Sequence, residues 1–349
     1  MHVNKKPASR RFFYSKKLKV SGVDRIDIVY LWVNGNDPVW QAKRQKAQQQ
    51  KLNPNQLAQY GNVAGRYRDN GELRYNLRAL ERFFPDHGQI FIVTDAQRPD
   101  WLAEHEKVTL IDHAELIPAI ARPVFDAGHI ESYLHHIPNL SERFIYLNDD
   151  IFFGAPVKLD DWFGPTGVAV HFEPNAAPTG EAIEQHETAL VNAAILSRRW
   201  LMLRPNYHHI PWLCAHAPRP MLKSALWELE HQAADLFKAV RSTTFRVWHV
   251  PPIMSDLALR WMIHQQQASP CHGEALYISS CDTHAAAQLA SLSQRFGQLP
   301  YFCINDTCDD CANDDPRLSA VGRTLAQLLP QPSQFEIAPL AKFASAPAQ

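Results

Sequence analysis

Short apolar runs alternate with helical repeats along the first half of the chain. Ile26–Val33, Gln89–Thr94 and Phe144–Leu147 are rich in β-branched and aromatic residues, which is typical of buried strands. Between the first two runs, four apolar residues recur at the spacing of a helix face: Leu73, Leu77, Leu80 and Phe84. Residues 108–111 predict another short strand, and residues 130–137 a second helix. Strands separated by helices indicate an α/β fold, with a Rossmann-like open, mostly parallel sheet and helices on both faces.

The second half of the chain is more helical. Six residues trace one apolar face of a long predicted helix: Leu222, Leu226, Leu229, Ala233, Phe237 and Val240. Residues 257–263 predict another helix, and residues 301–304 a short strand.

The length and composition of the chain suit one large domain. At 349 residues, with 46% hydrophobic and 20% charged residues, the chain can bury a sizeable core. We expect a single domain over residues 21–330, with an α/β half at about 21–170 and a more helical half at about 171–330. Residues 331–349 are rich in proline, alanine and serine and predict a loose tail.

Polar side chains follow the ends of three predicted strands, at Asn34–Asp37, Thr94–Asp95 and Asn148–Asp150. Ligands bind beyond the carboxyl ends of the strands in such sheets, so we expect these segments to lie close together. Two adjacent carboxylates at the end of a buried strand repel each other and lose hydration, so folding alone does not explain Asp149 and Asp150. Mg²⁺ or Mn²⁺ would remove that cost, and Mg²⁺ is typically held by one or two carboxylates plus substrate phosphates. The alternative is that one of these carboxylates caps the next turn.

Other polar positions have both a structural and a functional interpretation. Arg74 and Arg78 lie one helical turn apart, away from the leucines, where they are either solvated or able to bind phosphate oxygens. His216 lies in a proline-flanked loop; a lone histidine is more often structural, but its chemistry suits proton transfer. The segment Tyr301–Asp306 is again a short apolar strand that ends in Asn and Asp, so it predicts a second carboxylate for the metal.

The start of the chain is strongly basic. Residues 1–20 contain no acid and seven positive charges, at Lys5, Lys6, Arg10, Arg11, Lys16, Lys17 and Lys19. Such an arm is either a solvated tail or a contact with an anionic membrane surface or an anionic product. The net charge of −1 gives no support for a nucleic-acid partner. Since the chain has neither a long apolar run nor the apolar core of a signal peptide, we expect a cytoplasmic protein, peripheral at the inner membrane face if the arm binds lipid.

The six cysteines are too few and too scattered for a disulfide scaffold in a chain of this length. Cys303, Cys308 and Cys311 cluster, and Cys281 could supply a fourth zinc ligand, but this spacing matches no common zinc module. Free thiols are the expectation.

Four blocks of the sequence resemble the four regions that define the Stealth proteins. They are Ile26–Trp40; Arg66–Arg78 with Ile90–Asp95 and Phe144–Asp150; His216 to Arg246 and Asp256; and Phe302–Asp306. The blocks occur in the order of the family and together span about residues 26–310. One departure is Gly71, where family members usually carry an acid, so no carboxylate role is expected there.

The resemblance implies a sugar-1-phosphate transferase of bacterial capsule synthesis, in the same family as the catalytic subunit of the lysosomal-enzyme N-acetylglucosamine-1-phosphotransferase. Such an enzyme would move a hexose-1-phosphate from a UDP-sugar to a hydroxyl of the growing capsular polysaccharide, releasing UMP and leaving a phosphodiester. The alternative is a metal-dependent glycosyltransferase that attacks the anomeric carbon and releases UDP. A non-catalytic sugar-binding protein is disfavoured because all four polar blocks are present together.

The same resemblance implies roles for particular residues. The catalytic residues would be His216 as general base, Arg246 and Asp150. The substrate would be bound by Asn34, Gly35, Asp37, Arg74, Arg78 and Asp95. The Mg²⁺ or Mn²⁺ ion would be held by Asp149, Asp306 and Asn305.

Overall fold

The computed structural model describes residues 25–338, apart from 177–179, 181, 307 and 313–314. The basic arm of residues 1–20 lies outside the described residues.

A five-stranded sheet forms the centre of the first half of the chain. In spatial order its strands are β3 (Val108–Asp112), β2 (Ile90–Thr94), β1 (Ile26–Leu31), β4 (Arg143–Asn148) and β9 (Arg219–Leu222). The first four pair in parallel, and β9 pairs antiparallel with β4. Ile28 lies between Ile90 and Ile145 in the middle of the sheet, and all three side chains are fully buried. The mostly parallel sheet predicted from the sequence is therefore confirmed.

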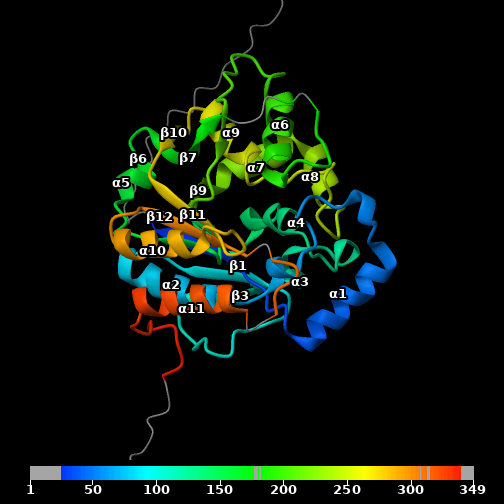
Figure 1. Ribbon diagram of the computed structural model, residues 1–349. Coiled ribbons are helices and arrows are strands. Elements are labelled where there is room, and N and C mark those ends of the chain that lie inside the picture. The colour runs from blue at the N-terminus through cyan, green and yellow to red at the C-terminus, as the bar shows by residue number, and fades with distance from the viewer. Residues whose placement is uncertain (1–24, 177–179, 181, 307, 313–314, 339–349) are drawn as a thin grey trace, which may run out of the picture.

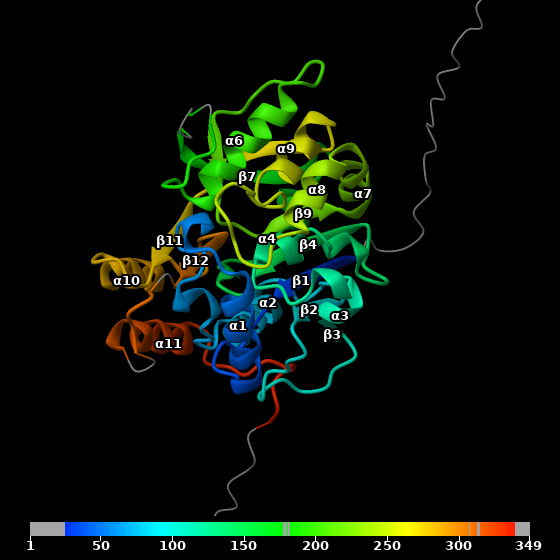
Figure 2. The same ribbon diagram turned by 90° about the vertical axis from the view of Figure 1, so that its right-hand side faces the viewer.

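Helices cover both sides of this sheet. Those of the first half are α1 (Pro38–Lys51), α2 (Glu72–Phe83), α3 (His113–Leu116) and α4 (Ala127–Glu131). Figures 1 and 2 show α2 on one side of the sheet and α4 on the other. Gly71 is the N-cap residue of α2, with φ at 83°, a left-handed conformation that glycine adopts at little cost. The helix predicted near residues 130–137 is interrupted, since α4 ends at Glu131 and a 3₁₀ turn follows at Leu134–His136.

The chain from residue 151 onward, which includes the predicted more helical half, contains helices and also two small sheets. Its helices are α5 (Leu159–Trp162), α6 (Ala189–Leu201), α7 (Lys223–Gln232), α8 (Ala234–Val240), α9 (Leu257–His264), α10 (Ala285–Arg295) and α11 (Pro316–Leu328). Helices α6 to α9 gather at the end of the molecule opposite α2 and α11 (Figures 1 and 2). None of the helices in the described part of the chain has the length and apolar character of a membrane span.

The single long helix predicted from Leu222 to Val240 is wrong, because α7 and α8 are separate helices that meet at Ala233. Ala233 is buried, and its backbone makes helix-type hydrogen bonds to Leu229 and Phe237 on either side. The apolar repeat continues through the break, so the spacing of the residues does not reveal it.

The two small sheets bring the second half against the first. One contains β10 (Ala268–His272), β7 (Gly167–Ala176) and β6 (Phe163–Gly164), with β8 (Trp212–Cys214) paired to β7. The other has the order β11 (Ala275–Ser279), β12 (Tyr301–Asn305) and β5 (Ile151–Phe153). Because β5 follows Asp150 directly and pairs antiparallel with β12, the Asn148–Asp150 and Asn305–Asp306 segments become neighbours. The backbone N–H of Ile304 donates to the carbonyl of Asp150 at 2.9 Å.

The C-terminal segment is ordered further than the sequence predicted. Phe335 is fully buried in the core, and Glu336 is buried against α2. Residues 331–338 are therefore part of the folded domain, and the expected loose tail does not begin at 331.

Candidate active site

A cavity of about 750 Å³ opens at the carboxyl ends of β1 and β4, between the central sheet and the second half of the chain. Both halves contribute charged side chains to its wall. These include Arg66, Arg68, Asp149 and Asp150 from the first half, and His216, Arg219, Arg246 and Asp306 from the second. The strand-end location predicted for a ligand site is the location of this cavity.

A buried hydrogen-bond network holds the turn that carries Asp149 and Asp150. Asn76, on the buried face of α2, donates to the carbonyls of Asp149 and Ile151 at 3.0 and 2.6 Å. The Tyr30 hydroxyl in turn donates to the Asn76 side chain at 2.9 Å. Because these hydrogen bonds hold the backbone of the turn, the carboxylates of Asp149 and Asp150 line the cavity from a fixed position.

Carboxyl groups crowd this part of the wall. Burial raises the pKa of Asp149 well above its usual range, and the nearby charges of Glu72, Asp150 and Asp69 raise it further. Burial also raises the pKa of Glu72 to about 7. The Oδ1 atom of Asp150 is buried and has no hydrogen-bond partner among the described residues. Unpartnered, mutually repelling carboxylates are a donor set that fits a divalent cation.

Asp306, expected as a metal ligand, lines the cavity but already has charged and polar partners, so its role in holding the metal stays a prediction. Its carboxylate forms an ion pair with Arg68 at 2.5 Å and accepts the backbone N–H of Cys308 at 2.9 Å. Asn305, expected beside it, donates to the Tyr277 hydroxyl at 2.7 Å. Among the described side chains, the carboxylates here do not form a group of three whose ligand atoms all lie within 4.8 Å of one another. Asp306 fixes the position of Arg68 in the cavity wall.

His216 lines the cavity next to a carboxylate that the sequence did not single out. Its Nδ1 lies 3.6 Å from Oε1 of Glu173, and this nitrogen has no hydrogen-bond partner in the described structure. The imidazole packs on the ring of Tyr277, with centroids 4.8 Å apart. Proximity to His216 lowers the pKa of Asp150, although burial dominates and the net effect is a raised pKa.

Three arginines supply positive charge to the same cavity. Arg246, expected from the sequence, lies 3.4 Å from Asp126. Arg66 and Arg219 were not singled out, yet both are positive neighbours of Asp150. Arg219 is buried against the ring of Tyr146. Arg66 lies within the second block of the sequence, where it could have been noticed, whereas β9 gave no sequence signal for Arg219.

Arg74 and Arg78 do not line the cavity, which corrects the expectation that they bind phosphate there. Both pair with Glu336, at 2.5 and 2.6 Å, and Arg78 also donates to the carbonyl of Leu329. These arginines fasten the C-terminal segment to α2. The sequence could not reveal this because Glu336 lay in the segment interpreted as a loose tail.

The residues expected to bind the nucleotide lie beside the cavity wall and not in it. Asn34 and Asp37 are joined by the side chain of Gln97, and Asp37 caps α1. Gly35 packs so closely on Tyr67 that a Cβ there would lie 2.1 Å from the Tyr67 carbonyl oxygen. Asp95 forms an ion pair with Lys43 at 2.8 Å. Gly35 thus packs against the segment that carries Arg66 and Arg68, and the substrate-binding role of all four residues stays a prediction.

Two family models match the chain. Residues 24–51 match conserved region 1 of the Stealth proteins, and residues 66–171 match conserved region 2. These ranges contain the first two blocks recognised in the sequence, including Asp149 and Asp150.

Relatives match over most of the chain. It is 35% identical over 315 residues to an exopolysaccharide phosphotransferase of Streptomyces coelicolor, and 33% identical over 316 residues to one of Nocardia farcinica. These matches cover 89% of this chain but 52% and 61% of the two relatives, which are longer. The receptor polysaccharide phosphotransferase WefC of Streptococcus gordonii is 30% identical over 348 residues, covering 90% of this chain and 100% of that protein. A crystal structure of the galactosyltransferase LgtC with donor and acceptor sugar analogues superposes with a TM-score of only 0.40 at 9% identity, over 88% of this chain and 98% of that one. On the region matches and the full-length match to WefC, the chain belongs to the Stealth protein family.

Proposed function

We propose that this chain is a polysaccharide phosphotransferase. It moves a hexose-1-phosphate from a UDP-sugar to a hydroxyl of an acceptor saccharide, releases UMP and leaves a phosphodiester. The observation that carries the proposal is the cavity itself, where buried carboxylates, arginines and His216 meet at the strand ends. The similarity to an exopolysaccharide phosphotransferase and to a receptor polysaccharide phosphotransferase supports phosphoryl transfer to a polysaccharide.

The carboxylates Asp149 and Asp150 are the residues that would hold a divalent cation. Their unpartnered oxygen and raised pKa values fit a cation, and Mg²⁺ or Mn²⁺ suits oxygen ligands. Bound there, the ion would neutralise charge on the donor diphosphate. Asp306 contributes indirectly, because it holds Arg68 at 2.5 Å.

The arginines Arg66, Arg219 and Arg246 would bind the phosphate oxygens. Phosphoryl transfer depends chiefly on positioning and on neutralising charge that spreads over these oxygens. Arginine suits this role because it stays charged and donates in a planar fork. All three line the cavity, and two of them are positive neighbours of Asp150.

His216 would take the proton of the acceptor hydroxyl. With Nδ1 turned toward Glu173, the other ring nitrogen, Nε2, would accept the proton of the acceptor hydroxyl. Glu173 would hold the ring in place and stabilise the positive charge that forms on it, as a carboxylate partner does for a general base. The hydroxyl oxygen then attacks the phosphorus attached to the donor sugar, and UMP leaves.

The released nucleotide distinguishes this reaction from a glycosyltransferase. The protein is incubated with UDP-hexoses and UDP-N-acetylhexosamines, an oligosaccharide primer and Mg²⁺, and the nucleotides are separated by chromatography. UMP in amounts equal to the transferred sugar is the expected product. UDP as the stoichiometric product would replace the proposal with a glycosyltransferase, and the absence of either nucleotide with every donor would contradict both.

A further inference from the structure

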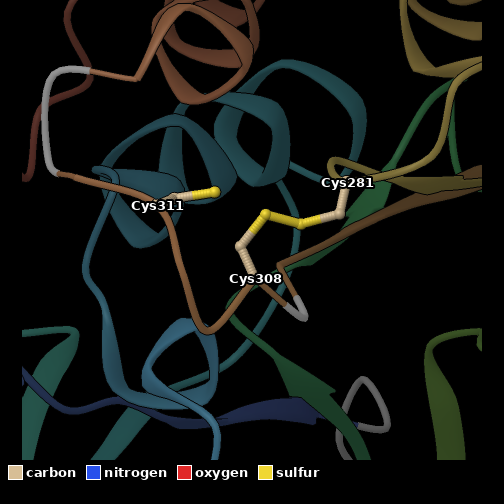
Figure 3. Close-up of side chains that lie close together, drawn as sticks. All are labelled: Cys281, Cys308 and Cys311. Atoms are coloured by element: carbon tan, nitrogen blue, oxygen red, sulfur yellow. A yellow bond between two sulfur atoms is a disulfide. The ribbon is translucent and has the colours of Figure 1, made fainter.

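Three cysteine sulfurs converge beside the cavity, where Cys281 follows β11 and Cys308 and Cys311 follow β12. Cys281 and Cys308 form a disulfide, and Cys311 is a free thiol. The sulfurs of all three lie within 4.8 Å of one another. Figure 3 shows the Cys311 side chain pointing toward the disulfide. A disulfide needs only two of these sulfurs, so the third requires another explanation.

The structure also changes which cysteines belong together. The sequence grouped Cys303 with Cys308 and Cys311, but the Cys303 sulfur points to Asp150 at 3.7 Å and stays apart from the cluster. Cys281, distant in sequence, takes its place because β11 and β12 pair in parallel and bring their carboxyl ends together. The expectation of free thiols is wrong for Cys281 and Cys308.

A carboxylate next to the cluster suits a bound cation. Oδ1 of Asp310 lies 3.9 Å from the Cys311 sulfur, within reach of a fourth ligand position after a small side-chain rotation. Arg317 donates to the same sulfur at 2.9 Å and lowers the pKa of Cys311, although desolvation dominates and the net effect is a raised pKa. Four-coordinate zinc holds thiolates at about 2.3 Å, which places their sulfurs about 3.8 Å apart. Three sulfurs within 4.8 Å need little movement to reach that spacing.

We propose that Cys281, Cys308 and Cys311 form a redox-gated site for a thiophilic divalent cation of the Zn²⁺ type. In the oxidised protein the Cys281–Cys308 disulfide closes the site. A dithiol reductant transfers two electrons to this disulfide, giving two cysteine thiols and the oxidised, cyclic form of the reductant. The cation then binds three thiolates and displaces their protons, with the fourth position open to Asp310 or water.

Either the disulfide or the bound cation would hold the segment of Cys308 and Cys311 against the cavity wall. The Cys308 carbonyl accepts the backbone N–H of Gly65 at 2.8 Å, and the Cys311 carbonyl accepts from Arg68 at 3.1 Å. Disulfide and metal are thus alternative ways to fix the segment that carries Arg68. The reduced protein without metal is the state in which that segment is least restrained.

Cobalt is the probe, because thiolate-bound Co²⁺ has an intense near-ultraviolet charge-transfer band that oxygen-bound Co²⁺ lacks. The full chain is reduced with a phosphine, freed of reductant without air, and titrated with Co²⁺ and then Zn²⁺. We expect one thiolate-bound Co²⁺ per chain in the reduced protein, its displacement by Zn²⁺, and no such band in the oxidised protein. Cys281→Ser, Cys308→Ser and Cys311→Ser should each weaken binding at least roughly tenfold.

Cys271→Ser is the matched control, since Cys271 is a half-buried free cysteine on β10. It should bind Co²⁺ as the unmodified chain does. Circular dichroism establishes that each reduced variant is folded. The proposal is overturned if the reduced chain gives no thiolate band, if Cys311→Ser keeps it, or if Cys271→Ser loses it. Because no sugar donor is involved, these results are independent of the proposed transferase activity.

Discussion

Replacing Glu72 with glutamine should stabilise the metal-free protein at neutral and alkaline pH. The Glu72 side chain is buried at the start of α2, where burial raises its pKa from 4.5 to about 7. A carboxyl with a raised pKa in the folded state favours folding while it is protonated. Its stabilising effect is present below pH 4.5 and is lost as the pH rises from 4.5 to about 7. Above this range the folded protein carries an unfavourable buried charge.

The size of the effect follows from that pKa difference. From 4.5 to about 7 is roughly 2.5 pKa units, and at 1.36 kcal/mol per unit this amounts to about 3 kcal/mol. Glutamine keeps one of the two oxygens that accept from Asn70, at 2.7 and 2.8 Å, so about 1 kcal/mol is lost with the other. We therefore expect Glu72→Gln to gain about 2 kcal/mol in unfolding free energy at pH 8 in EDTA.

Urea unfolding from pH 5 to pH 9, with EDTA or with Mg²⁺, measures the effect. Glu228→Gln, an exposed position on α7, is the control and should change little. Mg²⁺ should stabilise the unmodified protein most at high pH, because it compensates the cluster of carboxylates, and Asp149→Asn should weaken this response. A Glu72→Gln protein no more stable than the unmodified chain at pH 8 in EDTA would refute the reasoning.

Three further changes test other parts of the site. His216→Ala should lower kcat roughly 10²–10⁴-fold in steady-state kinetics while the KM for the donor stays nearly constant, and Glu173→Gln should lower kcat by a smaller factor. A raised donor KM at unchanged kcat in His216→Ala would make His216 a binding residue. Gly65→Ala places a Cβ 2.5 Å from Oδ1 of Asp306, so it should lower the unfolding free energy measured in urea by about 1–3 kcal/mol and raise the donor KM. An unaltered KM would argue against a donor-binding role for the segment that carries Arg66 and Arg68. Glu336→Ala removes the ion-pair partner of the buried Arg78 guanidinium, so it should lower the unfolding free energy by about 3 kcal/mol while the folded enzyme keeps its activity. A loss of donor affinity in a folded variant would indicate that Arg78 binds substrate.

The central sheet could be predicted because its signals are local. β1, β2 and β4 are apolar runs bounded by polar turns, and the leucines of α2 repeat at one helical spacing. The break at Ala233 and the small sheets of the second half depend on pairing between distant segments. The burial of Phe335 likewise depends on a surface that forms only when the chain has folded.

Asp149 and Asp150, expected at a strand end, and His216, expected in a loop, all line the cavity, while their roles there stay predictions. Partners could not be predicted, because ion pairs join residues far apart in sequence. Arg68 holds Asp306 across 238 positions, and the contact of Glu173 with His216 depends on the pairing of β7 and β8. Arg74 was assigned to phosphate because its partner, Glu336, lies in a segment whose composition predicted a loose tail.

The fate of the donor's β-phosphate tests the proposed reaction most directly. A UDP-sugar labelled with ³²P in the phosphate attached to the sugar is incubated with the full chain, Mg²⁺ and an oligosaccharide primer. If the acceptor attacks phosphorus, the label enters the saccharide as a phosphodiester that resists phosphatase, and the nucleotide released is unlabelled UMP. Label that stays entirely in UDP, with sugar transferred to the primer, would contradict the account.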